Sequence, residues 1–304
     1  MTVVLIDVAL AALLLVVVAR ARTARRQPRA RIAWLAAVIG AVALLTQGTL
    51  IPLPVMDGLL GGTNILKLVQ NVLTMVALWL GIHAGTAPLT ARVRTLRWGL
   101  PALLAAVFAA VFFVALPERG SSSFHFIEDA VRTSTGAWVY GVVHMAGIAA
   151  LGVLLCRSAR RSLPGVRPWF RVGAIGIVIG CASEIVDLTL TRFFTANAVV
   201  SALFDPLFYL GVLAFVIGIL RASYATASIR RRGGALLDEL ESLARTRGIG
   251  ETVPGDGTDA RLHALRVAVE DHAISTSRPL DTAERRVIDA VDVHLTRDFS
   301  GARP

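Results

Sequence analysis

The sequence predicts an all-α membrane protein, a bundle of seven transmembrane helices followed by a small helical tail. Hydrophobic residues make up 55% of the 304 residues and charged residues only 17%, whereas a soluble domain carries about a quarter charged residues. Mean hydropathy is +0.66. The apolar residues fall in blocks of about 18–24, the length that crosses a bilayer core of about 30 Å at about 1.5 Å per residue. We therefore expect a multi-pass protein of the plasma membrane.

Seven apolar blocks give the predicted spans, and the charge of the loops between them alternates. The blocks are residues 3–19, 32–53, 65–86, 98–116, 137–156, 171–195 and 199–220. Arginines cluster after the first, third, fifth and seventh blocks, and the other loops are poor in basic residues. Because basic loops stay in the cytoplasm, the pattern predicts an outside N-terminus and a cytoplasmic C-terminus. The arginines of these loops account for the net charge of +10, so the charge does not indicate a nucleic-acid partner.

The sixth predicted span, residues 171–195, is the one on which the functional hypothesis rests. It contains Glu184 and Asp187, and a carboxylate at membrane depth costs at least about 2.5 kcal/mol unless it faces the bundle interior or a wet cavity. These acids continue a stripe, at steps of three or four residues, that begins with Gly173, Gly176 and Gly180. Glycines let a neighbouring helix approach closely. The stripe predicts an interior helix that packs through its glycines.

Other spans place polar groups at a similar depth when residues are counted at about 1.5 Å each. This polar layer, in the outer half of the bundle, consists of Gln47, Lys67, Gln70, Asn71, His144, Glu184, Asp187 and Asp205. In one hypothesis the layer lines a cavity that binds a small polar or cationic solute or relays protons. Because its acids outnumber Lys67, the cavity would favour a cation. In the other, Lys67, Asp187 and Asp205 reach the interface and pair there, while the amides join helices by hydrogen bonds.

The composition changes near residue 222 to that of a soluble tail, which predicts two domains, 1–221 and 222–304. Apolar residues at helical spacing predict amphipathic helices over 235–247 and 259–274. A turn-rich break lies near 248–258. Asp281 followed by Glu284 is a capping box that opens a third helix. Residues 235–299 are expected to lie in the cytoplasm, where a partner protein would find them.

Motifs for chemistry are absent from the sequence. It contains no GxxxxGK[ST], GxSxG or HExxH motif, so we predict no catalytic residue and no enzyme. The two cysteines, Cys156 and Cys181, lack a CxxC spacing, and neither a metal site nor a cofactor is predicted.

Two stretches carry a family resemblance, PLPVMDGLLGGTNILKLVQNVL before and within the third span and RLHALRVAVEDHAI in the tail. Together with the layout, they resemble an actinobacterial family of multi-span membrane proteins that are described as transporters and have a C-terminal domain of unknown function. The resemblance implies transport.

Three functions are compatible with these features. The first is a permease for a small polar or cationic solute. The second is a seven-helix sensor that signals to a cytoplasmic partner through its tail, and the third is a membrane scaffold. The sequence shows no inverted repeat, which disfavours a transporter, whereas the amphipathic tail favours a sensor.

Overall fold

The computed structural model describes residues 2–26, 28–84, 91–116, 119–161, 165–250 and 257–301. Over these residues the secondary structure is helical and contains no strand. The chain divides into two compact units, Met1–Arg221 and Ala222–Pro304. The division falls where the composition of the sequence changes, and helix α10 runs through it.

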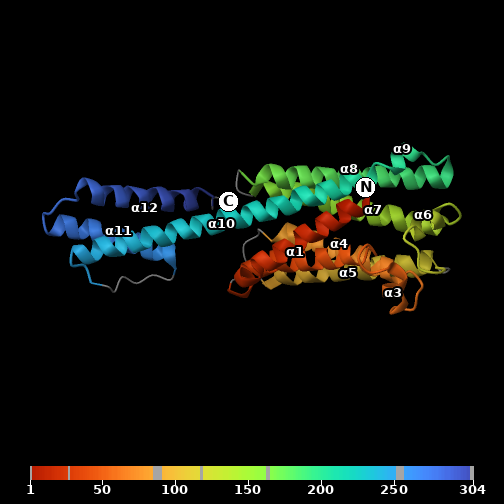
Figure 1. The fold of residues 1–304 in the computed structure, drawn as a ribbon, viewed down its shortest axis with the longest axis horizontal. Helices are drawn as coiled ribbons and strands as arrows, with labels where there is room; N and C mark the ends of the chain where they lie inside the picture. The colour runs from red at the N-terminus through yellow and green to blue at the C-terminus, as the bar shows by residue number, and fades with distance from the viewer. Residues whose placement is uncertain are drawn as a thin grey trace. The chain divides into compact units, whose positions relative to one another are not determined.

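Unit 1 is a bundle of long apolar helices with three short helices at one end (Figure 1). Its long helices are α1 (Thr2–Arg26), α2 (Pro28–Leu45), α4 (Ile65–His83), α5 (Ala91–Ala115), α7 (Thr135–Ser158), α8 (Arg167–Phe193) and the first half of α10 (Phe204–Thr246). The short ones are α3 (Leu53–Gly58), α6 (Phe126–Val131) and α9 (Ala198–Ser201), and a 3-10 turn spans Ala159–Arg161. Among the described residues, α1, α4, α7, α8 and the segment Ala198–Thr246 are long and apolar enough to cross a membrane. Two shorter apolar stretches, Ala30–Leu45 and Pro101–Ala115, belong to α2 and α5.

Two hydrophobic clusters hold unit 1 together. The larger one joins α1, α2, α4, α7, α8 and α10, with Ile6, Ile148, Ile177 and Val216 among its most buried residues. The second is aromatic and joins α4, α5, α7 and α8, and in it Tyr140 stacks on Phe108 at a centroid distance of 4.6 Å. Successive long helices run in opposite directions, so the connections between them alternate between the two ends of the bundle (Figure 1).

Helix α8 meets α10 through the glycines of its stripe. A Cβ atom built on Gly173 would lie 2.7 Å from the carbonyl oxygen of Gly211, and one on Gly176 would lie 3.0 Å from the Gly211 Cα. A Cβ on Gly180 would lie 3.0 Å from the backbone nitrogen of Phe208. The nearest neighbour in each case is a backbone atom of α10, so the two helices approach to backbone contact over about two turns of α8. The opposite face of α8 carries exposed Val and Ile residues.

Several helices begin or end away from the bounds of the predicted spans. The second span was predicted to reach residue 53, but α2 ends at Leu45, because Gly48 takes a φ of +87° and Pro52 then begins the turn into α3. The third was predicted to reach residue 86, whereas α4 ends at His83 and residues 85–90 lie outside the described part. The seventh, predicted as residues 199–220, is interrupted after α9, and α10 begins at Phe204 with Pro206 in its first turn, where proline is tolerated.

The tail helices of unit 2 pack on one another. The second half of α10, α11 (Thr258–Ser275) and α12 (Thr282–Gly301) enclose one hydrophobic core. Its buried members are Leu240, Ala244, Leu262, Leu265, Val269, Ile288, Val291 and Leu295. The first predicted tail helix, 235–247, is the end of α10 and not a separate element. Of the predicted break near 248–258, residues 251–256 lie outside the described part.

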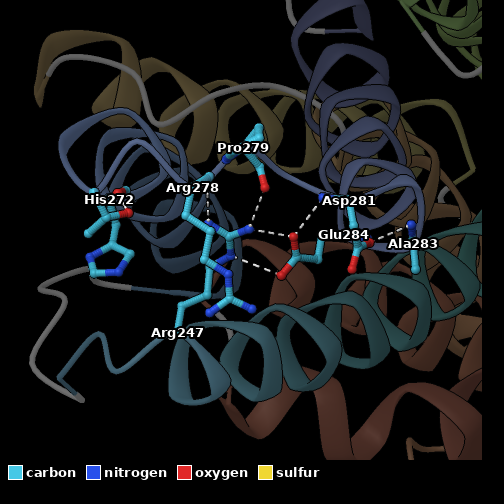
Figure 2. A network of polar contacts seen from close by, with 8 residues as sticks. Arg247, His272, Arg278, Pro279, Asp281, Ala283 and Glu284 are labelled. Atoms are coloured by element: carbon cyan, nitrogen blue, oxygen red, sulfur yellow. Dashed lines mark hydrogen bonds and ion pairs between the residues drawn. The ribbon is translucent and has the colours of Figure 1, made fainter.

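A network of polar contacts joins the C-terminal end of α10 to the start of α12 (Figure 2). The predicted capping box is confirmed: Asp281 Oδ1 accepts hydrogen bonds from the amides of Ala283 and Glu284, and Glu284 Oε2 accepts one from the Asp281 amide at 2.8 Å. Arg247, at the end of α10, donates to both carboxylate oxygens of Glu284 and to the carbonyls of Arg278 and Pro279. The hydrogen bonds from Arg247, followed by that from the Asp281 amide, lower the pKa of Glu284 to about 2.

Candidate functional site

A polar cavity of about 220 Å³ lies inside unit 1, and it is lined by all eight residues of the predicted polar layer. Four helices and one turn bring them there. Gln47 follows α2; Lys67, Gln70 and Asn71 lie on α4, His144 on α7, Glu184 and Asp187 on α8, and Asp205 in the first turn of α10. Ile127 and Glu128 of α6 also line the cavity, which places it toward the end of the bundle that carries the short helices.

Carboxyl groups outnumber the basic groups in the cavity walls. Glu184 and Asp187 are each 8% exposed and lie three residues apart on the same face of α8. Asp205 accepts a hydrogen bond of 2.7 Å from Thr2 Oγ1, which ties the start of α1 to the cavity. Glu128 adds a fourth carboxyl group from α6 and contacts His125 Nδ1. The acidic side chains that line the cavity are therefore four, against the single lysine.

Lys67 takes part in none of the ion pairs found among the described residues. Its ammonium group lies 5.2 Å from the centroid of the Phe124 ring, a cation–π distance. The lysine thus shares the cavity with the carboxyl groups but does not cancel any of them by direct pairing.

Two of the amides join helices, as the alternative hypothesis expects. Asn71 Nδ2 donates to the Tyr140 hydroxyl at 3.0 Å, which links α4 to α7. Gln47 Nε2 donates to the Tyr209 hydroxyl at 3.2 Å, which links the turn after α2 to α10. Within the polar layer, Asn71 and Gln47 therefore hold helices together.

Three other polar atoms of the cavity residues are buried and have no hydrogen-bond partner. They are Gln70 Oε1, His144 Nδ1 and Asp187 Oδ1, on side chains that are 5%, 5% and 8% exposed, respectively. Most buried polar atoms in proteins have a partner. Three such atoms around one cavity therefore point to water or a polar ligand between α4, α7 and α8.

Loop contacts that the sequence did not reveal hold the cavity wall at the short-helix end. Asp57 of α3 is fully buried and accepts hydrogen bonds from the amides of Asn64 and Leu66, both at 2.7 Å, and from the Ser122 hydroxyl. Asn64, with a φ of 60°, donates to two carbonyls of the segment 119–121. We call this set of contacts the Asp57 clasp. It fixes the segment that carries Phe124, which lines the cavity.

Sequence reasoning also missed Glu128, Tyr140, Tyr209 and Ser201, which line the cavity as well. Tyr140 is fully buried beside the cavity. Its position in α7, four residues before His144 and so on the same face, was a usable signal. Glu128 and Ser201 belong to short helices that no apolar periodicity marks.

A metal centre is not formed by the described part of the chain, where no three His, Cys, Asp or Glu side chains are grouped closely enough to hold an ion. Comparison with known proteins adds no assignment, since no protein-family model, curated protein or solved structure matches the chain.

Proposed function

We propose that this protein is a seven-span permease of the plasma membrane that takes a small polar or cationic solute into the polar cavity. The observation that carries the proposal is that carboxyl groups from three helices surround one space: Glu128 of α6, Glu184 and Asp187 of α8, and Asp205 of α10. Three buried polar atoms without a hydrogen-bond partner belong to residues that line the same space. In this proposal Glu184 and Asp187 bind the charged end of the solute, and His144 and Gln70 hydrogen-bond it.

The helix ends support the proposed topology. The two apolar stretches in α2 and α5 bring the five candidate spans to seven. Arginines of the described helices gather where α1 ends, α2 begins, α7 ends and α8 begins, as with Arg25, Arg31, Arg157 and Arg171. All of these positions lie at the end of the bundle opposite α3, α6 and α9. By the positive-inside rule this distribution favours a cytoplasmic side at that end, which supports a cavity in the outer half of the membrane and an outside N-terminus.

A seven-helix sensor is the second candidate, and α10 favours it. The helix begins with Asp205 in the cavity wall and ends with Leu240 and Ala244 in the core of the tail unit. A ligand that shifts the first turns of α10 would thus act on the same helix that builds the tail core. The partner would be a cytoplasmic protein that binds within residues 235–299. Membership of the actinobacterial transporter family remains a prediction from the sequence.

The test compares Glu184→Gln with Asp129→Asn in the full-length protein. Both changes remove one carboxylate, but Asp129 is exposed on α6 and does not line the cavity. Radiolabelled ethylammonium and choline serve as probes, with binding measured by equilibrium dialysis in nanodiscs and uptake measured in proteoliposomes. Because a hydrogen bond to a charged group is worth about 1.5–3 kcal/mol, Glu184→Gln should weaken binding by at least about tenfold, and Asp129→Asn should leave it unchanged.

The outcomes separate the candidates. Uptake that is lost in Glu184→Gln and kept in Asp129→Asn supports the permease. Binding without uptake, together with altered hydrogen exchange of α11 and α12 when the probe is added, supports the sensor and refutes transport. If neither probe binds the wild-type protein, or if Glu184→Gln binds as well as the wild type, the polar cavity is not the solute site.

A further inference from the structure

A second cavity of about 80 Å³ adjoins the polar one inside unit 1, and its walls are apolar. Small residues on α2 and α4 leave this space: Ala36, Ala37, Gly40 and Ala43 on α2, and Ala77 on α4. Phe208, Val212, Phe215 and Val216 of α10 close the other side. We call it the aliphatic cavity.

Three residues line both cavities: Gln47, Thr74 and Phe208. From this shared wall the polar cavity extends toward the start of α10, where Asp205 lies. The aliphatic cavity extends the opposite way along the same helix, to Val216 and Ile219. The two spaces therefore follow one another along α10, polar first and apolar second.

Two polar side chains line the aliphatic cavity, and each makes a hydrogen bond to another residue. Gln47 Nε2 donates to the Tyr209 hydroxyl, and Thr74 Oγ1 donates to the carbonyl of Gln70 at 2.9 Å. A buried water requires two to four polar partners, and cavities with aliphatic walls stay dry or take apolar molecules. The chemistry of this cavity thus suits hydrocarbon, whereas that of its neighbour suits an amine.

We propose that the two cavities form one site for an amphipathic organic cation, whose ammonium head lies among the carboxyl groups of the polar cavity and whose hydrocarbon tail fills the aliphatic cavity. This inference rests on the proposed solute site and narrows its ligand class, whether the protein transports the ligand or senses it. Glu184 and Asp187 bind the head. The small residues of α2 and α4 set the length of tail that the site accepts.

The experiment uses a homologous series of n-alkylammonium ions, from methyl to hexyl, and the full-length protein in nanodiscs. Ala77→Leu fills the aliphatic cavity without adding a polar group. Ala146→Leu makes the same change on an exposed position of α7 that lines neither cavity. At each chain length the dissociation constant of the variant is divided by that of the wild type. This ratio cancels the partition of longer amines into the nanodisc lipid.

The ratio for Ala77→Leu should be close to one for methylammonium and should then rise about fourfold per methylene group, the value of one buried CH₂, up to the length that fills the cavity. The ratio for Ala146→Leu should stay near one throughout. Unchanged methylammonium binding shows that the variant is folded, and Ala36→Leu replaces Ala77→Leu if it is not.

A flat ratio across the series would overturn the inference while leaving the proposed solute site intact, because the head alone would then be recognised. If the wild type binds no member of the series, the proposed function falls as well. A rising ratio in Ala146→Leu would show that the chain-length effect belongs to the lipid-facing surface, which also overturns the two-cavity site.

Discussion

Replacement of Gly173 by alanine should loosen the contact between α8 and α10, on which the position of the acidic face depends. A Cβ at this position would meet the Gly211 carbonyl oxygen at 2.7 Å, the Phe215 backbone nitrogen at 2.8 Å and the Phe215 Cβ at 3.0 Å. Two of these three neighbours are backbone atoms, which cannot rotate away. The helices must therefore move apart to admit the methyl group.

The magnitude follows from two opposed effects. Inserting a carbon atom into a packed interior costs about 1–3 kcal/mol, and the backbone neighbours of Gly173 put the cost in the upper part of that range. Alanine is more favourable than glycine within a helix by about 0.5–1 kcal/mol. The net loss in free energy of unfolding should be about 1–2 kcal/mol. Gly176→Ala, whose closest contact would be 3.0 Å, should cost less.

Unfolding of the full-length protein by SDS in mixed micelles, followed by tryptophan fluorescence, measures this loss. Gly99→Ala is the matched control, because Gly99 lies in α5 and a Cβ there would have no neighbour within 4 Å. The control should be neutral or slightly stabilising. A double variant, Gly173→Ala with Gly211→Ala, should lose less than the sum of the two single losses, since one separation of the helices relieves both clashes.

The reasoning fails if Gly173→Ala unfolds with the free energy of the wild type, or if Gly99→Ala is as destabilising as Gly173→Ala. The first result would show that the helices are not held at backbone contact. The second would show that alanine acts through something other than the interface.

Three further predictions concern the tail unit and the loops. Leu262→Ala removes a fully buried side chain from the tail core and should destabilise that core by about 2–5 kcal/mol. Ile274→Ala is the control, because the Ile274 side chain is 78% exposed, and it should have almost no effect. Hydrogen exchange of α11 and α12 measures both. The lowered pKa of Glu284, about 2 against a usual 4.5, contributes stability above pH 4.5 that is lost as the pH falls toward 2. Glu284→Gln should therefore flatten the acid-induced rise in α12 exchange, and an unchanged pH profile would contradict the assigned pairing. Asp57→Ala leaves three donors of the Asp57 clasp without an acceptor and should speed amide exchange in the segment 119–125. Asp129→Ala is the control and should leave these exchange rates unchanged. If Asp57→Ala exchanges at the wild-type rate, the clasp does not hold the loop.

The polar layer could be predicted because helix geometry is fixed. Counting residues placed Glu184, His144 and Asp205 at one depth, and the stripe on α8 placed Glu184 and Asp187 on the face that packs inside the bundle. All four residues line the polar cavity. The sequence could not show which amides would pair with tyrosines. Asn71 and Gln47 engage hydroxyl groups far away in the chain, and no local pattern encodes such partners.

The loop contacts and the helical continuity of α10 beyond Arg221 were beyond sequence reasoning, for different reasons. The clasp depends on Asp57 meeting Ser122, 65 residues further along, and apolar periodicity carries no information on that pairing. The helical stretch between the seventh span and residue 235 was not predicted, because its arginines and the pair Gly233–Gly234 have no amphipathic pattern. Propensity is a weak prior that packing overrides. At Gly233 an added Cβ would lie 2.9 Å from His294 Nε2, so this glycine allows α12 to approach α10.

Because α10 is one continuous helix from Phe204 to Thr246, inserted residues change its helical phase. Each residue turns an α-helix by about 100°, so one residue inserted after Arg221 would shift the helical phase of the rest of α10 by that angle. Seven inserted residues would restore the phase to within about 20°. A carrier that works within the membrane should be indifferent to such insertions. A receptor that signals through its tail should lose signalling when one residue is inserted and recover it when seven residues are inserted.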